Sequence, residues 1–161
     1  MGLQNGRENR GQKAAIYETT YSRVLNELLL LADPEMQAIE KYIRCARVFV
    51  YKQDDAVLGV AAVTREDEKT FELKNIAVRE DVQGMGIGGM LVTHVKEVFK
   101  GNRIIVGTSD AHPRILRFYE RCGFTRFHVI KNFFIDNYEQ PVIDNGRRCV
   151  DMVILEVKER Q

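Results

Sequence analysis

Gln83-Gly84-Met85-Gly86-Ile87-Gly88-Gly89 is the most informative stretch of this 161-residue sequence. Glycines at alternate positions let backbone N–H groups approach a ligand without an intervening Cβ. Apolar residues at three-and-four spacing follow from Met90 to Phe99, and Gly101 ends the pattern, so the loop is predicted to open a helix. A helix N-terminus carries a partial positive charge, and the expected ligand is therefore a phosphate.

The same glycines allow two other interpretations. Gly84-x-Gly86-x-x-Gly89 matches the dinucleotide fingerprint, and Asp110 follows about 20 residues later, where a ribose acceptor is expected. In that fingerprint the strand runs directly into the first glycine, whereas here residues 79–83 intervene. A glycine-rich turn that only permits close helix packing is the third possibility. The phosphate site is the preferred hypothesis.

The sequence before the loop predicts two helices followed by three strands. An extended stretch, 14–19, precedes apolar residues at helical spacing over 24–32, and a second helix carries Met36 to Ile43, with Asp33 as its cap and Pro34 in its first turn. The period then changes to two over 47–51, 56–64 and 70–78. Short polar turns separate these strands, which indicates an antiparallel meander.

The sequence after the loop predicts a strand–helix–strand arrangement. A buried strand over 104–107 is followed by a helix over 113–122, which Gly123 ends, and by strands over 124–130 and 149–157. A long segment, 131–148, separates the last two strands. The order β-α-α-β-β-β-α-β-α-β-β predicts an α/β fold with a mixed (α+β) sheet.

Composition limits the organisation and the partners. The length and 45% hydrophobic residues predict one domain over residues 13–161, preceded by a loose polar arm over residues 1–12. A net charge of +1 gives no case for nucleic acid or a membrane surface as partner. No apolar run is long enough to span a membrane, and no signal peptide is evident, so a cytoplasmic location is expected. Three cysteines without ligand spacing suggest neither a disulfide framework nor a metal site, and we expect each to be a small buried hydrophobe.

Three motifs together resemble the signature of the GCN5-related N-acetyltransferase (GNAT) superfamily. They are Leu73-x-x-Ile76-Ala77-Val78, Gln83-x-x-Gly86-x-Gly88 and Phe118-Tyr119-Glu120-Arg121-Cys122-Gly123-Phe124. The resemblance covers residues 47–130 and implies the acyl-CoA N-acyltransferase fold. It further implies acetyl-CoA as cosubstrate, an amine as acceptor, and direct transfer without an acyl-enzyme or a metal.

The resemblance also assigns cofactor contacts. It implies that the pyrophosphate of CoA binds the backbone N–H groups of the glycine loop: Gln83, Gly84, Met85, Gly86, Ile87, Gly88 and Gly89. Ile76, Ala77 and Val78 match the strand that separates from its neighbour in this family and whose unpaired backbone groups hold the pantetheine arm. His112 stands where the family often has Asn, seven residues before the tyrosine, and we keep it as a cofactor contact.

Acetyl transfer from a thioester to an amine needs a neutral amine and a proton for the departing thiolate. Tyr119 matches the family tyrosine that supplies this proton; its alternative role is a core aromatic. Glu72 matches the position of the general base in the histone acetyltransferase that names the family, and by the period of two it would share a strand face with Lys74, Ile76 and Val78. Its alternatives are an ordinary surface ion pair with Lys74 or Arg65, and replacement by a water chain.

The family resemblance places the acceptor between the first two helices and segment 131–148. That segment holds Phe133, Phe134 and Tyr138 beside acidic residues, which would suit a cationic amine, although an acidic solvated loop or a homodimer contact is an alternative. A small-molecule amine is the favoured acceptor. The other hypotheses are acetylation of a protein N-terminus or lysine, and a CoA-binding module without catalysis.

Overall fold

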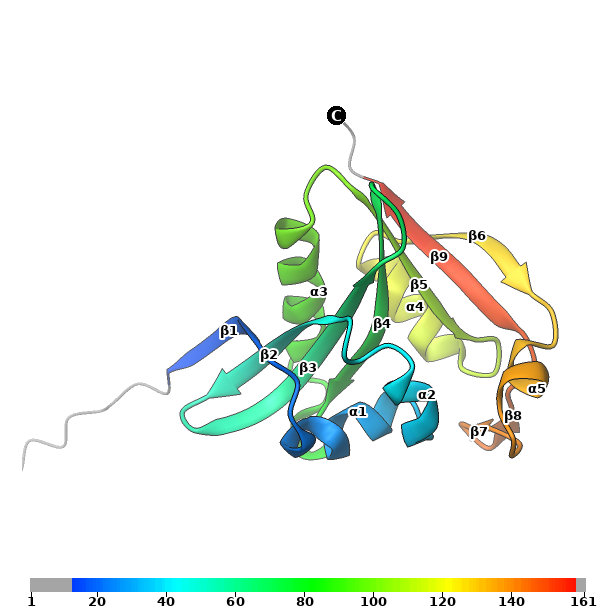
Figure 1. Ribbon diagram of the computed structural model, residues 1–161, viewed down its shortest axis with the longest axis horizontal. Coiled ribbons are helices and arrows are strands. Elements are labelled where there is room, and N and C mark those ends of the chain that lie inside the picture. The colour runs from blue at the N-terminus through cyan, green and yellow to red at the C-terminus, as the bar shows by residue number, and fades with distance from the viewer. Residues whose placement is uncertain (1–12, 159–161) are drawn as a thin grey trace, which may run out of the picture.

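The computed structural model describes residues 13–158, and the loose arm predicted for residues 1–12 lies outside them. The described residues form a seven-stranded sheet with the order β1-β2-β3-β4-β5-β9-β6 (Figure 1). Its strands are β1 (Ala14–Thr19), β2 (Arg47–Gln53), β3 (Ala56–Arg65), β4 (Thr70–Val78), β5 (Arg103–Ser109), β6 (Thr125–Ile130) and β9 (Met152–Lys158). Only the β4–β5 pair is parallel. The predicted mixed sheet with an antiparallel first half is therefore confirmed.

Helices cover both faces of the sheet because its strands alternate apolar side chains between two cores. On the first face, α1 (Asn26–Ala32), preceded by a 3-10 turn over Arg23–Leu25, and α2 (Met36–Glu40) pack on Val48, Val50, Val60 and Ala62. On the second face, α3 (Ile87–Val98) and α4 (Pro113–Arg121) pack on Phe49, Ala61, Val63 and Leu73. We call these the α1–α2 face and the α3–α4 face.

One buried polar residue ties β4 to the first two helices. Asn75 is 3% exposed, and its Nδ2 donates hydrogen bonds to the carbonyl oxygen of Leu29 at 2.9 Å and to the hydroxyl of Tyr42 at 3.0 Å. A buried amide needs such partners, since an unmade hydrogen bond costs about 1–3 kcal/mol. Asn75 therefore fixes the position of α1 and α2 relative to the middle of β4.

Three local predictions need correction. Asp33 does not cap α2, because that helix begins at Met36 with Glu35 in the capping position and no side-chain cap. Segment 131–148 is not an irregular loop: it contains α5 (Phe133–Asn137) and a hairpin of β7 (Ile143–Asp144) and β8 (Arg147–Arg148). Asn145 and Gly146 form its turn with φ of 51° and 69°, as a two-residue hairpin requires. Cys45 is exposed rather than buried.

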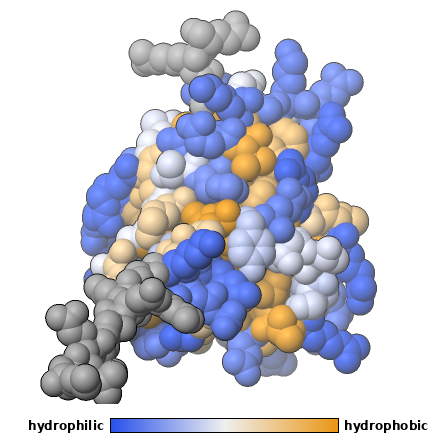
Figure 2. Space-filling model, turned by 90° about the vertical axis from the view of Figure 1, so that its left-hand side faces the viewer, coloured by the Kyte–Doolittle hydropathy of each residue, from blue (hydrophilic) through white to orange (hydrophobic). Residues whose placement is uncertain are grey.

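On the side of the molecule that carries β1, most of the surface is hydrophilic (Figure 2). There, hydrophilic side chains surround an area of mixed, partly apolar character (Figure 2). No helix within residues 13–158 is long and apolar enough to cross a membrane.

Gly59 on β3 permits the close approach of α3 to the sheet. A Cβ at this position would lie 2.9 Å from Cδ1 of Leu91 and 3.3 Å from the carbonyl oxygen of Ala77. We therefore expect Gly59→Ala to lower the free energy of unfolding by about 1–3 kcal/mol through overpacking, measured by urea denaturation. Gly89→Ala is the contrast, because its Cβ meets nothing within 4 Å, and we expect it to add up to about 1 kcal/mol. Equal stability of the two variants would contradict this account.

Candidate active site

The site begins where β4 leaves β5. The two strands pair only from Thr70 to Glu72 on β4 and from Arg103 to Ile105 on β5, and they diverge beyond these residues (Figure 1). Residues 73–78 remain paired with β3 alone among the described strands. The separation expected at Ile76, Ala77 and Val78 is thus present. Backbone polar groups on the open edge of β4 need partners from elsewhere.

A β-bulge at Lys74 changes which face each side chain occupies. Leu73 pairs with Val63 and Asn75 pairs with Ala62, so Lys74 is the extra residue. Such a residue interrupts the strict alternation of faces. Glu72 and Lys74 therefore line a pocket on the α1–α2 face, whereas Ile76 and Val78 pack on the α3–α4 core. The prediction that all four share one face is wrong for this reason.

The glycine loop leads into the N-terminus of α3, as predicted. Gly86 occupies the capping position with φ of 87°, and Gly84 has φ of 81°, a region that favours glycine. An added Cβ at Gly84, Gly86 or Gly89 would meet nothing within 4 Å. The loop therefore borders open space, and a phosphate there would face the first N–H groups of a twelve-residue helix. These features fit the pyrophosphate of CoA.

Two loop residues have additional contacts. The side-chain Nε2 of Gln83 donates a hydrogen bond to the carbonyl oxygen of Val78 at 2.9 Å, so it joins the loop to the end of β4. The backbone N–H of Gln83 already donates to the carbonyl oxygen of Glu80 at 3.4 Å. Gly88 lies against α4, because its Cβ would be 3.3 Å from the ring of Phe118. The phosphate cradle therefore rests on both β4 and α4.

Tyr119 lies in the core on the α3–α4 face. It is 5% exposed, packs edge-on against Phe118 and Phe124, and belongs to the same cluster as Ile76 and Val78. Burial raises the pKa of the Tyr119 hydroxyl well above its ordinary value of 10. The phenol therefore keeps its proton at neutral pH, and its two possible roles, packing and proton donation, are compatible.

Glu72 lies on the opposite face, in the α1–α2 pocket. Its side chain is 18% exposed, and its Oε1 lies 3.5 Å from Nζ of Lys74. Burial raises the pKa of Glu72 above 4.5; the charge of Lys74 opposes this shift, and nearby Glu66 adds to it. The ion pair with Lys74 that the sequence left open is present. The Glu72 carboxylate is therefore partly desolvated, and it lines a cavity instead of facing bulk water.

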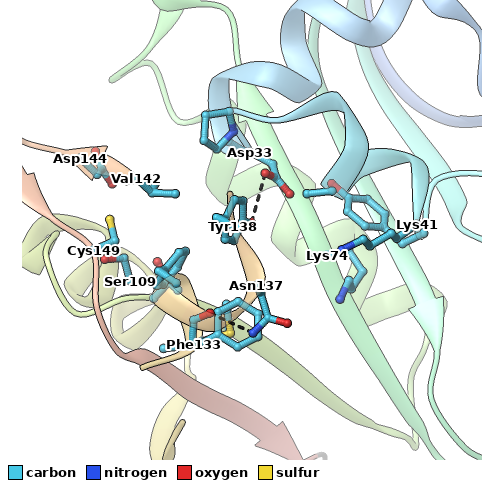
Figure 3. A pocket seen from close by; sticks show the side chains of 18 of the residues that line it. Asp33, Lys41, Lys74, Ser109, Phe133, Asn137, Tyr138, Val142, Asp144 and Cys149 are labelled. Atoms are coloured by element: carbon cyan, nitrogen blue, oxygen red, sulfur yellow. Dashed lines mark hydrogen bonds between the residues drawn. The ribbon is translucent and has the colours of Figure 1, made fainter. Parts of the chain in front are cut away.

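The pocket that Glu72 lines has a cavity volume of about 450 Å³. Its walls come from the end of α1, α2, β4, β5 and the α5–β8 segment, so it lies between the first two helices and segment 131–148 (Figure 3). Phe133, Phe134 and Tyr138 all contribute to it, so these aromatics serve a pocket within the chain. The hydroxyl of Tyr138 donates a hydrogen bond to Oδ1 of Asp33 at 3.2 Å, which joins two walls that are 105 residues apart in sequence.

His112 lies at the N-terminus of α4, outside the residues that line this pocket. Its Nε2 is 3.9 Å from Oδ1 of Asp144, and its Nδ1 is buried without a hydrogen-bond partner in the described structure. Such a nitrogen can meet a bound cofactor, and the assignment of His112 as a cofactor contact stays a prediction. Within residues 13–158 no cluster of His, Cys, Asp and Glu could hold a metal ion.

Comparison with known proteins identifies the family. Residues 44–126 match the acetyltransferase (GNAT) domain. An uncharacterised N-acetyltransferase of Bacillus subtilis, YvbK, is 33% identical over 134 residues, which cover 81% of this chain and 86% of that protein. A GNAT family acetyltransferase from Elizabethkingia anophelis, solved with acetyl-CoA bound, is 33% identical with a TM-score of 0.85, over 91% of this chain and 98% of that one. A Bacillus cereus structure titled IAA acetyltransferase is 35% identical with the same TM-score, over 91% and 100% of the two chains.

The chain therefore belongs to the GNAT family, as the three sequence motifs indicated. It is an acetyl-CoA-dependent N-acetyltransferase. The dinucleotide interpretation of the glycine loop is wrong, since the preceding strands form an antiparallel meander rather than parallel βαβ units.

Sequence reasoning missed several polar residues of the pocket. Lys41, Tyr42 and Asp33 all line it, yet on helical spacing Tyr42 reads as a core residue and Asp33 as a cap. In the sequence these residues share only their location in or near the two short helices. That location does not predict which of their side chains will contact a segment from the other end of the chain.

The open space at Gly86 leads to a binding prediction. Acetyl-CoA at 100 times its dissociation constant is expected to stabilise the protein by about 2.7 kcal/mol, seen as a thermal shift. Gly86→Asp should abolish this shift, because it puts a Cβ and a carboxylate against the phosphates. Gly101→Asp is the matched control, since Gly101 also has positive φ and no atom within 4 Å of its Cβ. A folded Gly86→Asp protein with unchanged affinity would remove this loop from the cofactor site.

Proposed function

We propose that the protein transfers the acetyl group of acetyl-CoA to the primary amine of a small molecule. The observation that carries this proposal is the position of the acceptor pocket on the α1–α2 face of the sheet, at the separation of β4 and β5, with the glycine loop on the α3–α4 side. A pocket of about 450 Å³ suits a small molecule. The two substrates would then meet through the opening between the strands.

A hydrogen bond between two walls of the pocket favours a small acceptor over a protein chain. The Tyr138–Asp33 hydrogen bond joins the α5 segment to the α1–α2 connection. An extended peptide would require an open groove, and walls joined in this way are less suited to one. Acetylation of a protein N-terminus or lysine is therefore the second candidate.

The glycine loop, with Ile76, Ala77, Val78 and His112, is proposed to hold the cofactor. Support comes from the open cradle of the loop, the unpaired edge of β4 and the orphan Nδ1 of His112. The solved relative from Elizabethkingia anophelis carries acetyl-CoA, and a Bacillus subtilis acetyltransferase that is 30% identical, with a TM-score of 0.85, was solved in complex with CoA. Acetyl-CoA supplies the acetyl group as a reactive thioester.

Glu72 and Tyr119 are proposed to move the two protons of the reaction from opposite faces of the sheet. An aliphatic amine has a pKa near 10, so only about one molecule in a thousand is neutral at pH 7. Glu72 accepts the proton that the ammonium loses, directly or through a water. The N–C bond forms as the C–S bond breaks, and Tyr119 donates its proton to the thiolate; the second proton, which the acetylated nitrogen then loses, restores the phenol.

Tyr119→Phe tests the proton donor. We expect kcat to fall by about 10- to 10⁴-fold while CoA affinity changes little, since only one hydroxyl is lost. The measurements are steady-state release of the CoA thiol and calorimetric CoA binding. Tyr17→Phe, at an exposed tyrosine of β1, serves as control. Joint loss of CoA binding and thermal stability in Tyr119→Phe would instead make Tyr119 a packing residue.

Glu72→Gln tests the base through pH. The wild-type rate should fall as pH drops through the pKa of Glu72, which burial sets above 4.5, because only the carboxylate accepts a proton. The glutamine variant should lose this limb, be slow at neutral pH, and recover partly in alkaline buffer, where the amine is neutral without help. Glu97→Gln, on the exposed side of α3, is the control. A wild-type rate and pH profile in Glu72→Gln would exclude Glu72 as the base.

A further inference from the structure

The acceptor pocket contains cationic groups that an amine substrate alone does not explain. Lys41, an exposed residue directly after α2, and Lys74 from β4 both line it, and Figure 3 shows them at the end of the pocket away from Asp144. Within residues 13–158, Lys41 forms no ion pair. Two lysines repel an ammonium, so a purely cationic acceptor would be disfavoured at this end.

The carboxylates of the pocket neutralise this end only in part, because they pair with Lys74 and leave Lys41 without an ion pair among the described residues. Asp33 accepts its hydrogen bond from Tyr138 and interacts electrostatically with Lys74, and Asp144 lies nearest to His112. Among the ion pairs of the described residues, Lys74 has Glu72 as its partner, with 3.5 Å between Nζ and Oε1. A carboxylate that accepts the substrate proton cannot also remain the permanent partner of Lys74.

A third donor points to the same end of the pocket. Nζ of Lys74 lies 5.5 Å from the ring centroid of Tyr42, so the phenol and the ammonium are neighbours. The Tyr42 hydroxyl already accepts a hydrogen bond from Nδ2 of Asn75 at 3.0 Å, and its own hydrogen can therefore be donated. Burial raises the pKa of Tyr42 to about 12, which keeps that hydrogen in place at neutral pH. Lys41, Lys74 and Tyr42 thus form a set of donors suited to an anion.

We propose that the acceptor carries a carboxylate on the carbon next to its amine, as an α-amino acid does, and that Lys41 and Lys74 bind this carboxylate. The proposal rests on the proposed function and names its substrate class. The adjacent cation and anion of Lys74 and Glu72 are complementary to the adjacent carboxylate and ammonium of such a substrate. Phe133, Phe134 and Met152 on the pocket wall provide an apolar surface for its side chain. Apolar α-amino acids are therefore the favoured acceptors.

Matched acceptor pairs test the proposal. The protein is assayed with acetyl-CoA and either phenylalanine or phenethylamine, and either leucine or isopentylamine, members of each pair differing only by the carboxylate. We expect kcat/KM to be at least about tenfold higher for the amino acid in each pair, as for a charge-assisted hydrogen bond.

Lys41→Met is the deciding variant, because it removes a positive charge and leaves Glu72 in place. The amine pKa of each acceptor is the same with both enzymes, so it cancels when wild type and variant are compared. The preference for the amino acid, taken as a ratio of kcat/KM values, should fall by about 10- to 100-fold. Lys100→Met, at an exposed lysine beyond α3, should keep the ratio. A variant that only loses folded protein would lower both rates and leave the ratio unchanged.

Two results would overturn the inference in distinguishable ways. Equal kcat/KM values for the amine and the amino acid of each pair, or an unchanged ratio in Lys41→Met, would refute the carboxylate site. The proposed acetylation of a small-molecule amine would still stand. Failure of all four acceptors, in a protein that still binds acetyl-CoA and acetylates a peptide N-terminus or lysine, would refute the proposed function and the inference together.

Discussion

The early end of the pairing between β4 and β5 is the constraint on which the site depends. The parallel ladder stops after three residue pairs, and the bulge at Lys74 then redirects the strand. Because β4 stays paired with β3, the strand remains ordered while its other edge is open. In the proposed function, this separation lets the cofactor on the α3–α4 side reach the pocket on the α1–α2 side. A fully paired sheet would keep any two substrates apart.

Burial shifts the pKa of the two groups proposed to move protons in the same direction, with different consequences for an acid and for a base. Desolvation raises the pKa of both Tyr119 and Glu72. For the phenol this means that the proton stays bound at neutral pH and that the phenol is a weaker acid than an exposed tyrosine. For the carboxylate it means a stronger base than an exposed glutamate, while the charge of Lys74 limits the shift. The same physical effect thus strengthens the proposed base on one face of the sheet and keeps the proposed donor on the other face protonated.

The acceptor pocket joins segments that are distant in the chain. The hydrogen bond between Tyr138 and Asp33 brings the α5 segment onto the α1–α2 connection, and Asn75 on β4 holds the residues on either side of it, Leu29 in α1 and Tyr42 after α2. The pocket is consequently sensitive to changes in any of three regions. The cofactor side depends instead on a short continuous loop and one helix N-terminus. Acceptor choice can therefore vary among proteins of this fold while the cofactor site is kept.

The sequence by itself determined the order of the main elements, the glycine loop at the start of α3 and the family, because these rest on periodicity and on glycines that are close in the chain. Gln83 to Gly89 indicate a phosphate site wherever they precede a helix. The sequence did not reveal that Asp33 meets Tyr138 instead of capping α2, or that Glu72 and Lys74 face away from Ile76 and Val78. A one-residue bulge reverses a strand's faces without a signal in composition, and contacts over 105 residues depend on how the elements pack. Only the tertiary structure therefore decided which side chains surround the acceptor.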